Sequence, residues 1–72
     1  MIAVVKKDIS VLIKKGDRLK LIGKNFILEG DSEPFAKRVE ITFNGKKEVY
    51  WPPNYYPKKQ VQQMKDYFKI IK

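Results

Sequence analysis

An aromatic and proline-rich segment between two lysine pairs, residues 46–59, carries the side chains of this sequence best suited to binding chemistry. It holds the only Trp, three of the four Tyr and three of the four Pro, and it begins with Lys46-Lys47 and ends with Lys58-Lys59. Aromatic rings between cations commonly stack on bases and neutralise phosphates. The same rings could instead fill a small hydrophobic core. The segment therefore predicts a binding surface and leaves its ligand open.

No catalytic or metal-binding pattern accompanies this segment. The chain has no Cys and no His, which are the usual ligands of zinc sites. Its eight carboxylates stand mostly beside lysines or in turns, and none forms a recognisable acid–base pair. We expect a protein that is not an enzyme and that needs no metal or cofactor.

The charge balance predicts an anionic partner. Sixteen basic and eight acidic residues give a net charge of +8, which favours nucleic acid or an acidic protein face. Residues 46–72 contribute seven basic and two acidic groups, a net +5. Lysines outnumber arginines fourteen to two. Because bidentate reading of guanine favours arginine, we expect contacts to the nucleic-acid backbone rather than to base edges.

Neither a membrane partner nor export is expected. No apolar run approaches the roughly 18 residues that a membrane span needs. The first residues are apolar and reach lysine only at Lys6-Lys7, which is the reverse of the order in a signal peptide. These patterns favour a cytoplasmic protein.

The elements that must position the segment are short strands followed by one helix, within a single domain over residues 1–72. Hydrophobic alternation broken by turns predicts a β-rich part over residues 1–51, including strands at 2–5 and 9–13 and a hairpin around Asn44-Gly45. About five short strands in this length favour a small five-stranded SH3-like barrel or a curved antiparallel sheet. Apolar residues at spacings of three, four and three then predict a C-terminal amphipathic helix over residues 57–71.

The register of the hairpin decides where the Trp lies. A two-residue loop pairs Val39 with Tyr50 and leaves Trp51 on the opposite face, among basic residues. A three-residue loop pairs Val39 with Trp51 and places the indole ring in the core. Turn chemistry favours the first register and hydrophobic matching favours the second. Because burial usually settles register, we expect a buried Trp51.

The remaining rings and the lysines form the candidate site. Tyr55 and Tyr56 lie between prolines, on a stiff, extended segment. The lysine pair at the predicted helix start is a candidate for anion contacts. The residues that we expect to bind nucleic acid or an acidic partner are Arg38, Lys46, Lys47, Tyr50, Tyr55, Tyr56, Lys58, Lys59 and Lys65.

Two stretches resemble the SH3 domain. Residues 8–22, with the turn Lys15-Gly16-Asp17, are similar to the strand that this family enters through a lysine-glycine-acid turn. Residues 52–56, Pro-Pro-Asn-Tyr-Tyr, are similar to its Pro-Ser-Asn-Tyr segment. The resemblance implies a small barrel, and it implies that Pro52, Asn54 and Tyr55 line a groove for proline-rich peptides.

The chain also resembles the small basic chromatin proteins of archaea, which are SH3-like barrels closed by a C-terminal helix. The likeness lies in size, charge, the order of strands and helix, and residues 56–64. It implies a sheet that lies on the minor groove of DNA, where intercalating apolar side chains kink the duplex.

Two functions remain open from the sequence. The first is a nucleic-acid-binding module with little sequence specificity. The alternative is an interaction module, for example a phage or mobile-element regulator or inhibitor that docks on an acidic host protein through the aromatic-proline segment.

Overall fold

The computed structural model describes residues 1–72 as a mostly β protein with one short helix. Five antiparallel strands form one sheet in the order β6-β3-β2-β1-β7, and β4 and β5 form a separate two-stranded hairpin. The elements in chain order are β1 (Ile2–Val5), β2 (Arg18–Ile22), β3 (Asn25–Leu28), β4 (Val39–Phe43), β5 (Lys46–Tyr50), β6 (Tyr55–Pro57), α1 (Lys58–Gln63) and β7 (Phe68–Ile71).

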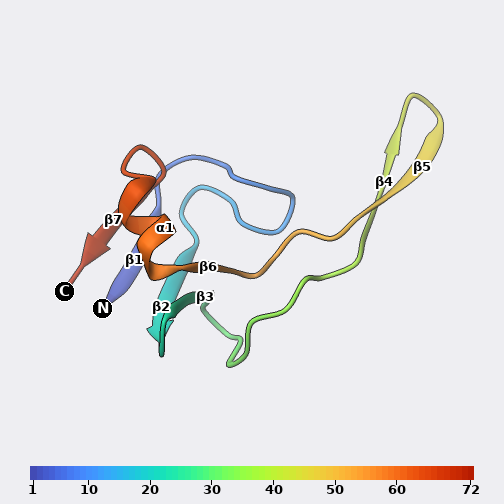
Figure 1. Ribbon diagram of the computed structural model, residues 1–72. Helices are drawn as coiled ribbons and strands as arrows, with labels where there is room; N and C mark the ends of the chain where they lie inside the picture. The colour runs from blue at the N-terminus through green and yellow to red at the C-terminus, as the bar shows by residue number, and fades with distance from the viewer.

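The expected antiparallel β fold is confirmed, but no closed barrel is found. The outer strands β6 and β7 do not pair with each other, and α1 and a turn connect them. The sheet is therefore open (Figure 1).

One small core holds the sheet together. Phe26 and Leu19 are fully buried at its centre, and α1 contributes Val61 to the same cluster. The other members are Ala3, Val5, Ile13 and Phe68. Seven residues make a modest core, so the stability margin of this short chain is thin.

The long C-terminal helix expected over residues 57–71 is wrong beyond Gln63. The helix ends at Met64, whose backbone (φ −92°, ψ 56°) leaves the helical region, and residues 68–71 form β7 alongside β1. Val61 and Phe68 are buried as the helical stripe required. Pairing with β1 gives residues 68–71 backbone hydrogen-bond partners along the whole strand. A longer helix would have left the backbone groups on this edge of β1 without partners.

The strand expected over residues 9–13 is also wrong. This segment is a series of bends in which the Ser10 hydroxyl accepts hydrogen bonds from the backbone N–H groups of Leu12 (3.2 Å) and Ile13 (3.1 Å). Such local side-chain bonds compete with strand pairing. Ile13 nevertheless reaches the core.

The β4–β5 hairpin projects from the sheet and gives the molecule its elongated shape, with extents of 44 × 24 × 19 Å (Figure 1). We call residues 38–51 the arm. Its two strands are joined by Asn44 and Gly45, which have positive φ angles of 51° and 76°, as a two-residue type I′ turn requires. No helix in the structure has the length and apolar character needed to cross a membrane.

Candidate nucleic-acid interface

The arm has the register of the two-residue loop. Val39 pairs with Tyr50, Ile41 with Glu48 and Phe43 with Lys46. The expectation of a buried Trp51 is therefore wrong: its side chain is 60% exposed. The arm stands clear of the core, so neither register would bury one of its faces. The chemistry of the turn therefore determined the register.

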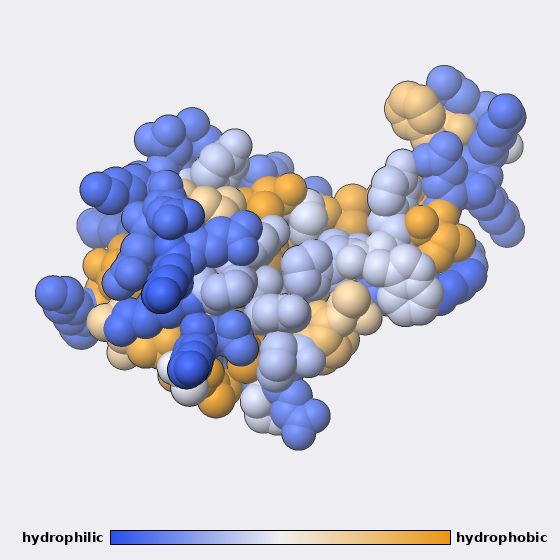
Figure 2. Space-filling view, viewed as in Figure 1, coloured by the Kyte–Doolittle hydropathy of each residue, from blue (hydrophilic) through white to orange (hydrophobic).

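The arm exposes apolar rings on both of its faces. Phe43 is 63% exposed near the turn, and Trp51 and Tyr50 are 60% and 46% exposed where β5 ends. Every residue of β5 is exposed. Figure 2 shows the arm as a largely hydrophilic projection with apolar patches along it.

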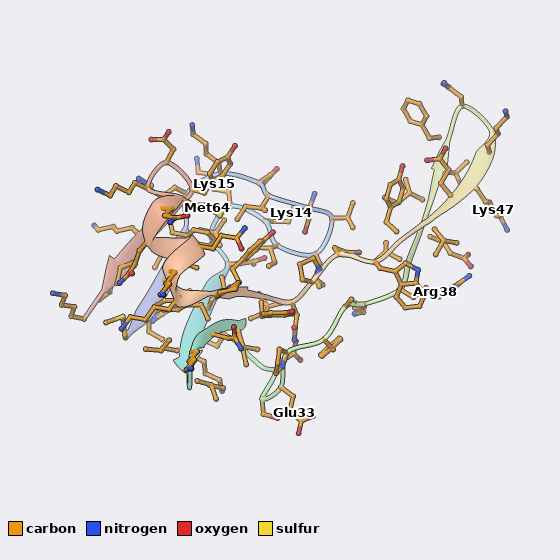
Figure 3. All side chains as sticks on the ribbon, viewed as in Figure 1. Lys14, Lys15, Glu33, Arg38, Lys47 and Met64 are labelled. Carbon is orange, nitrogen blue, oxygen red and sulfur yellow. The ribbon has the colours of Figure 1, made fainter.

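The acidic groups of the arm are already engaged, whereas its lysines are free. Glu40 Oε1 forms an ion pair with Arg38 Nη2 at 2.7 Å, and the Tyr50 hydroxyl donates a hydrogen bond to Glu48. That hydrogen bond and the negative charge of Glu48 raise the pKa of Tyr50. Lys46 and Lys47 form no ion pair. The positive charge at the turn is therefore available to an external anion; Figure 3 shows Arg38 and Lys47 on the arm.

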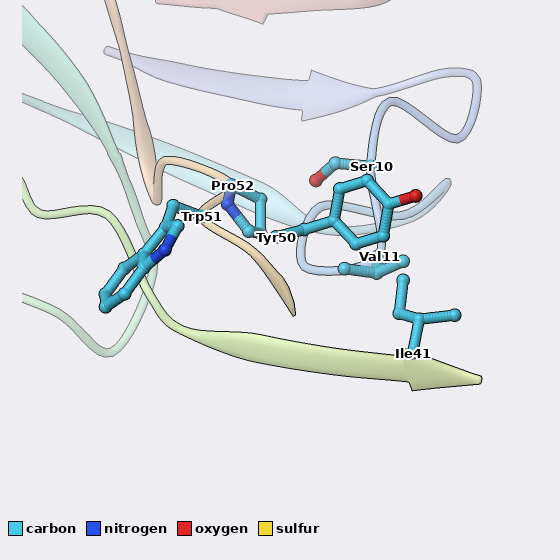
Figure 4. Close-up of a pocket in the computed structure, with 6 residues that line it drawn as sticks. All are labelled: Ser10, Val11, Ile41, Tyr50, Trp51 and Pro52. Carbon is cyan, nitrogen blue, oxygen red and sulfur yellow. The ribbon is translucent and has the colours of Figure 1, made fainter. Parts of the chain in front are cut away.

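A hollow lies where the arm meets the body of the protein. Ile41 and Tyr50 from the arm face the bend that carries Val11, whereas the indole ring of Trp51, which also lines the hollow, points away from that bend (Figure 4). The cavity has a volume of about 390 Å³. Ser10 and Pro52 complete its lining. The hollow is mainly apolar and open to solvent.

A second hollow is basic and lies on the body. Lys58 and Lys59 at the start of α1 face the β2–β3 turn at Gly23 and Lys24, around a cleft of about 530 Å³ without a hydrophobic residue in its lining. The backbone N–H of Lys58 donates to the carbonyl oxygen of Lys24 at 2.9 Å, which joins the two sides. We call Lys24, Lys58 and Lys59 the basic cleft.

The other residues expected in the site do not lie on the arm. Tyr55 and Tyr56 are half-buried on β6; Tyr56 packs edge-on against Phe68 with ring centres 5.9 Å apart, and burial raises its pKa. Lys65 is exposed in the turn after α1, which lies at the end of the molecule away from the arm (Figure 1).

Two of the three residues that the SH3 resemblance assigns to a groove are buried. Pro52 is buried, and Asn54 is 0% exposed. The Asn54 side chain forms its hydrogen bonds with residues of the loop between β3 and β4. This asparagine is a structural residue.

Sequence reasoning missed Phe43, Trp51 and Lys24 as surface residues of these two sites. The Asn44-Gly45 turn carried the signal for Trp51, because a type I′ turn fixes the register that exposes it. No local signal joins Lys24 to Lys58, which are brought together by the pairing of β3 with β6. Comparisons of the chain with protein-family models, with curated proteins and with solved structures give no match.

Proposed function

We propose that this protein binds nucleic acid with little sequence specificity and that the arm is its main contact. The observation that carries the proposal is a two-stranded ribbon that stands clear of the body and presents unpaired lysines and exposed rings.

The charges of the arm support contact with phosphates. Residues 38–51 carry three basic groups and two acidic groups, a net +1, and both carboxylates have partners within the arm. The one arginine of the arm, Arg38, is held by Glu40. Phosphate contact by Lys46 and Lys47 thus dominates over base reading, which suits a sequence-tolerant binder.

The rings of the arm supply the second kind of contact. Trp51 and Phe43 are more than half exposed, and aromatic side chains stack on bases whatever their identity, or wedge between base steps. Because Phe43 pairs with Lys46, one ligand strand can meet a ring and a lysine at the turn of the arm.

The basic cleft supports a second phosphate contact. Its three lysines form no ion pair and surround a hollow that no hydrophobic residue lines. A nucleic acid held by the arm and by this cleft would span both parts of the molecule.

Binding to fluorescently labelled duplex DNA, single-stranded DNA and RNA, measured at several salt concentrations, tests this function. We expect log K to fall linearly with log salt by ~0.9 for each phosphate neutralised on duplex DNA. Binding that does not depend on salt, or no binding to any of the three, would rule the function out.

A second candidate function is docking on an acidic protein. It is favoured by the apolar hollow of Ile41, Tyr50 and Trp51, since Tyr and Trp dominate the energy of protein interfaces. A stoichiometric complex with a purified acidic protein that persists after nuclease treatment, together with no affinity for nucleic acid, would favour this function over the first.

A further inference from the structure

We propose that the arm is completed by the arm of a second copy of this chain, with the two β4 strands paired antiparallel in a four-stranded sheet β5-β4-β4-β5. The proposal does not rest on nucleic-acid binding. It starts from the isolation of the hairpin: no backbone hydrogen bond joins residues 38–51 to the rest of the chain. A two-stranded hairpin alone is marginally stable in water, whereas three or more strands with an apolar face are stable.

The outer edge of β4 is the one long strand edge that this chain leaves unprotected. Proteins commonly blunt exposed edges with lysine, proline or very short strands. β5 carries Lys46 and Lys47, β7 carries Lys69, and β6 has three residues and ends in Pro57. β4 has five residues, Val-Glu-Ile-Thr-Phe, with no lysine and no proline.

The hydrogen-bonding groups of that edge match a two-fold partner. Antiparallel pairs alternate between hydrogen-bonded and non-hydrogen-bonded, and Phe43 and Lys46 close the type I′ turn. In the closing pair, the backbone N–H and C=O groups of Phe43 point toward β5, and so do those of Ile41 and Val39. The backbone groups of Glu40 and Thr42 therefore point away from β5, toward the free edge of β4. An axis through Ile41 sets Glu40 of one copy opposite Thr42 of the other, so that outward groups meet outward groups.

The same axis makes the side chains self-complementary. Ile41 lies opposite Ile41 of the second copy, and Val39 lies opposite Phe43, so the two central β4 strands present a shared apolar strip on one face. Directly paired residues share a face, and the exposed ring of Phe43 (63%) gains a neighbour. The only charge within β4, on Glu40, is balanced by Arg38 at 2.7 Å.

The corresponding pairing through β5 is unfavourable. Its outward backbone groups belong to Lys47 and Val49, and the central axis through Glu48 would oppose two carboxylates. An axis through Lys47 would oppose two ammonium groups. Like charges directly opposite destabilise a sheet. These two axes of β5 are therefore disfavoured, whereas the axis through Ile41 of β4 opposes no like charges; the remaining axis of β5, through Val49, is the one that the Val49→Cys control tests.

Cysteine cross-linking tests the proposed axis directly. The chain has no native Cys, so Ile41→Cys introduces a single thiol, and a non-hydrogen-bonded antiparallel pair holds its Cα atoms about 4.5 Å apart, within disulfide range. We expect Ile41→Cys to form a covalent dimer under mild oxidation and the control Val49→Cys, on the outer edge of β5, to remain monomeric. Equal cross-linking of both variants, or none of either, would overturn the proposal.

Sedimentation across micromolar to millimolar protein, without nucleic acid, provides the second test. Thr42→Pro removes an outward N–H from β4 and leaves the β4–β5 ladder in place, and Val49→Pro is the matched change on β5. We expect dimers for the unmodified chain and Val49→Pro, and monomers for Thr42→Pro. A monomer at every concentration, or association that appears only after nucleic acid or another protein is added, would overturn the proposal. If either proline variant loses its native circular dichroism, the cysteine pair decides.

Discussion

The side-chain Oδ1 of Asn54 accepts a hydrogen bond from the backbone N–H of Phe35 at 2.8 Å. The amide Nδ2 of the same side chain donates to Asp31 Oδ2 and to the carbonyl oxygen of Glu33, both at 3.0 Å. The backbones of Asn54 and Phe35 are also bonded, at 2.9 Å. These contacts join the chain entering the arm to the chain leaving it, so a buried asparagine fixes the base of the projecting hairpin.

Asn54→Ala tests this clamp. The substitution removes the three hydrogen bonds of the buried Asn54 side chain. Because each contributes about 0.5–1.5 kcal/mol, we expect a loss of about 2–3 kcal/mol in the free energy of unfolding. Urea denaturation followed by circular dichroism measures it. Gln62→Ala, at an exposed position of α1, is the control and should change little. A tolerated Asn54→Ala would contradict the role of the clamp.

Trp51→Ala separates binding from stability. Because the ring is 60% exposed, we expect the free energy of unfolding to fall by less than about 1 kcal/mol, whereas affinity for single-stranded nucleic acid falls by about 1–3 kcal/mol through lost stacking. Phe26→Ala, at a fully buried position, should instead cost about 3–5 kcal/mol of stability. The reverse ranking of the two stability losses would show that Trp51 is a core residue.

The double substitution Lys46→Gln and Lys47→Gln tests the charge of the arm. We expect weaker duplex binding and a salt slope reduced by about 0.9 for each lost phosphate contact. Lys69→Gln with Lys72→Gln removes the same charge at the C-terminal end, which lies away from the arm (Figure 1). Equal effects of the two pairs in fluorescence anisotropy would assign binding to net charge alone.

We expect Tyr56→Phe to change how the stability of the protein depends on pH in the alkaline range. Burial raises the pKa of Tyr56 above its ordinary value, so the neutral phenol is favoured in the folded state. The resulting stability is fully present below the unfolded pKa of about 10 and is lost as pH rises through the folded pKa. We expect thermal stability of the Phe variant to match the unmodified chain near neutrality and to fall less above pH ~10. Parallel pH profiles would argue against a buried phenol.

The local signals in the sequence predicted the parts of the fold that depend on neighbouring residues. Asn44-Gly45 fixed a hairpin, and the alternation on either side of it gave β4 and β5. The sequence also predicted β1 and the antiparallel β class. The apolar stripe of Val61 and Phe68 identified core residues, although only the first of them is helical.

Long-range pairing produced what the sequence could not predict. β7 exists because β1 offers a free edge, and a three-residue strand such as β6 has too little pattern to recognise. Trp51 is exposed because the arm projects away from the core. This tertiary arrangement cannot be predicted from the periodicity of the sequence. For the same reason the basic cleft, which joins Lys24 to Lys58, was invisible along the chain.

Amide chemical shifts during titration with a short DNA duplex test most directly whether the arm is the binding element. We expect the largest shifts at Arg38–Trp51, with a second group at Lys24, Lys58 and Lys59, and little change at β1 and β7. Shifts confined to β1 and β7, or small and uniform shifts across the whole chain at saturating DNA, would contradict binding through the arm.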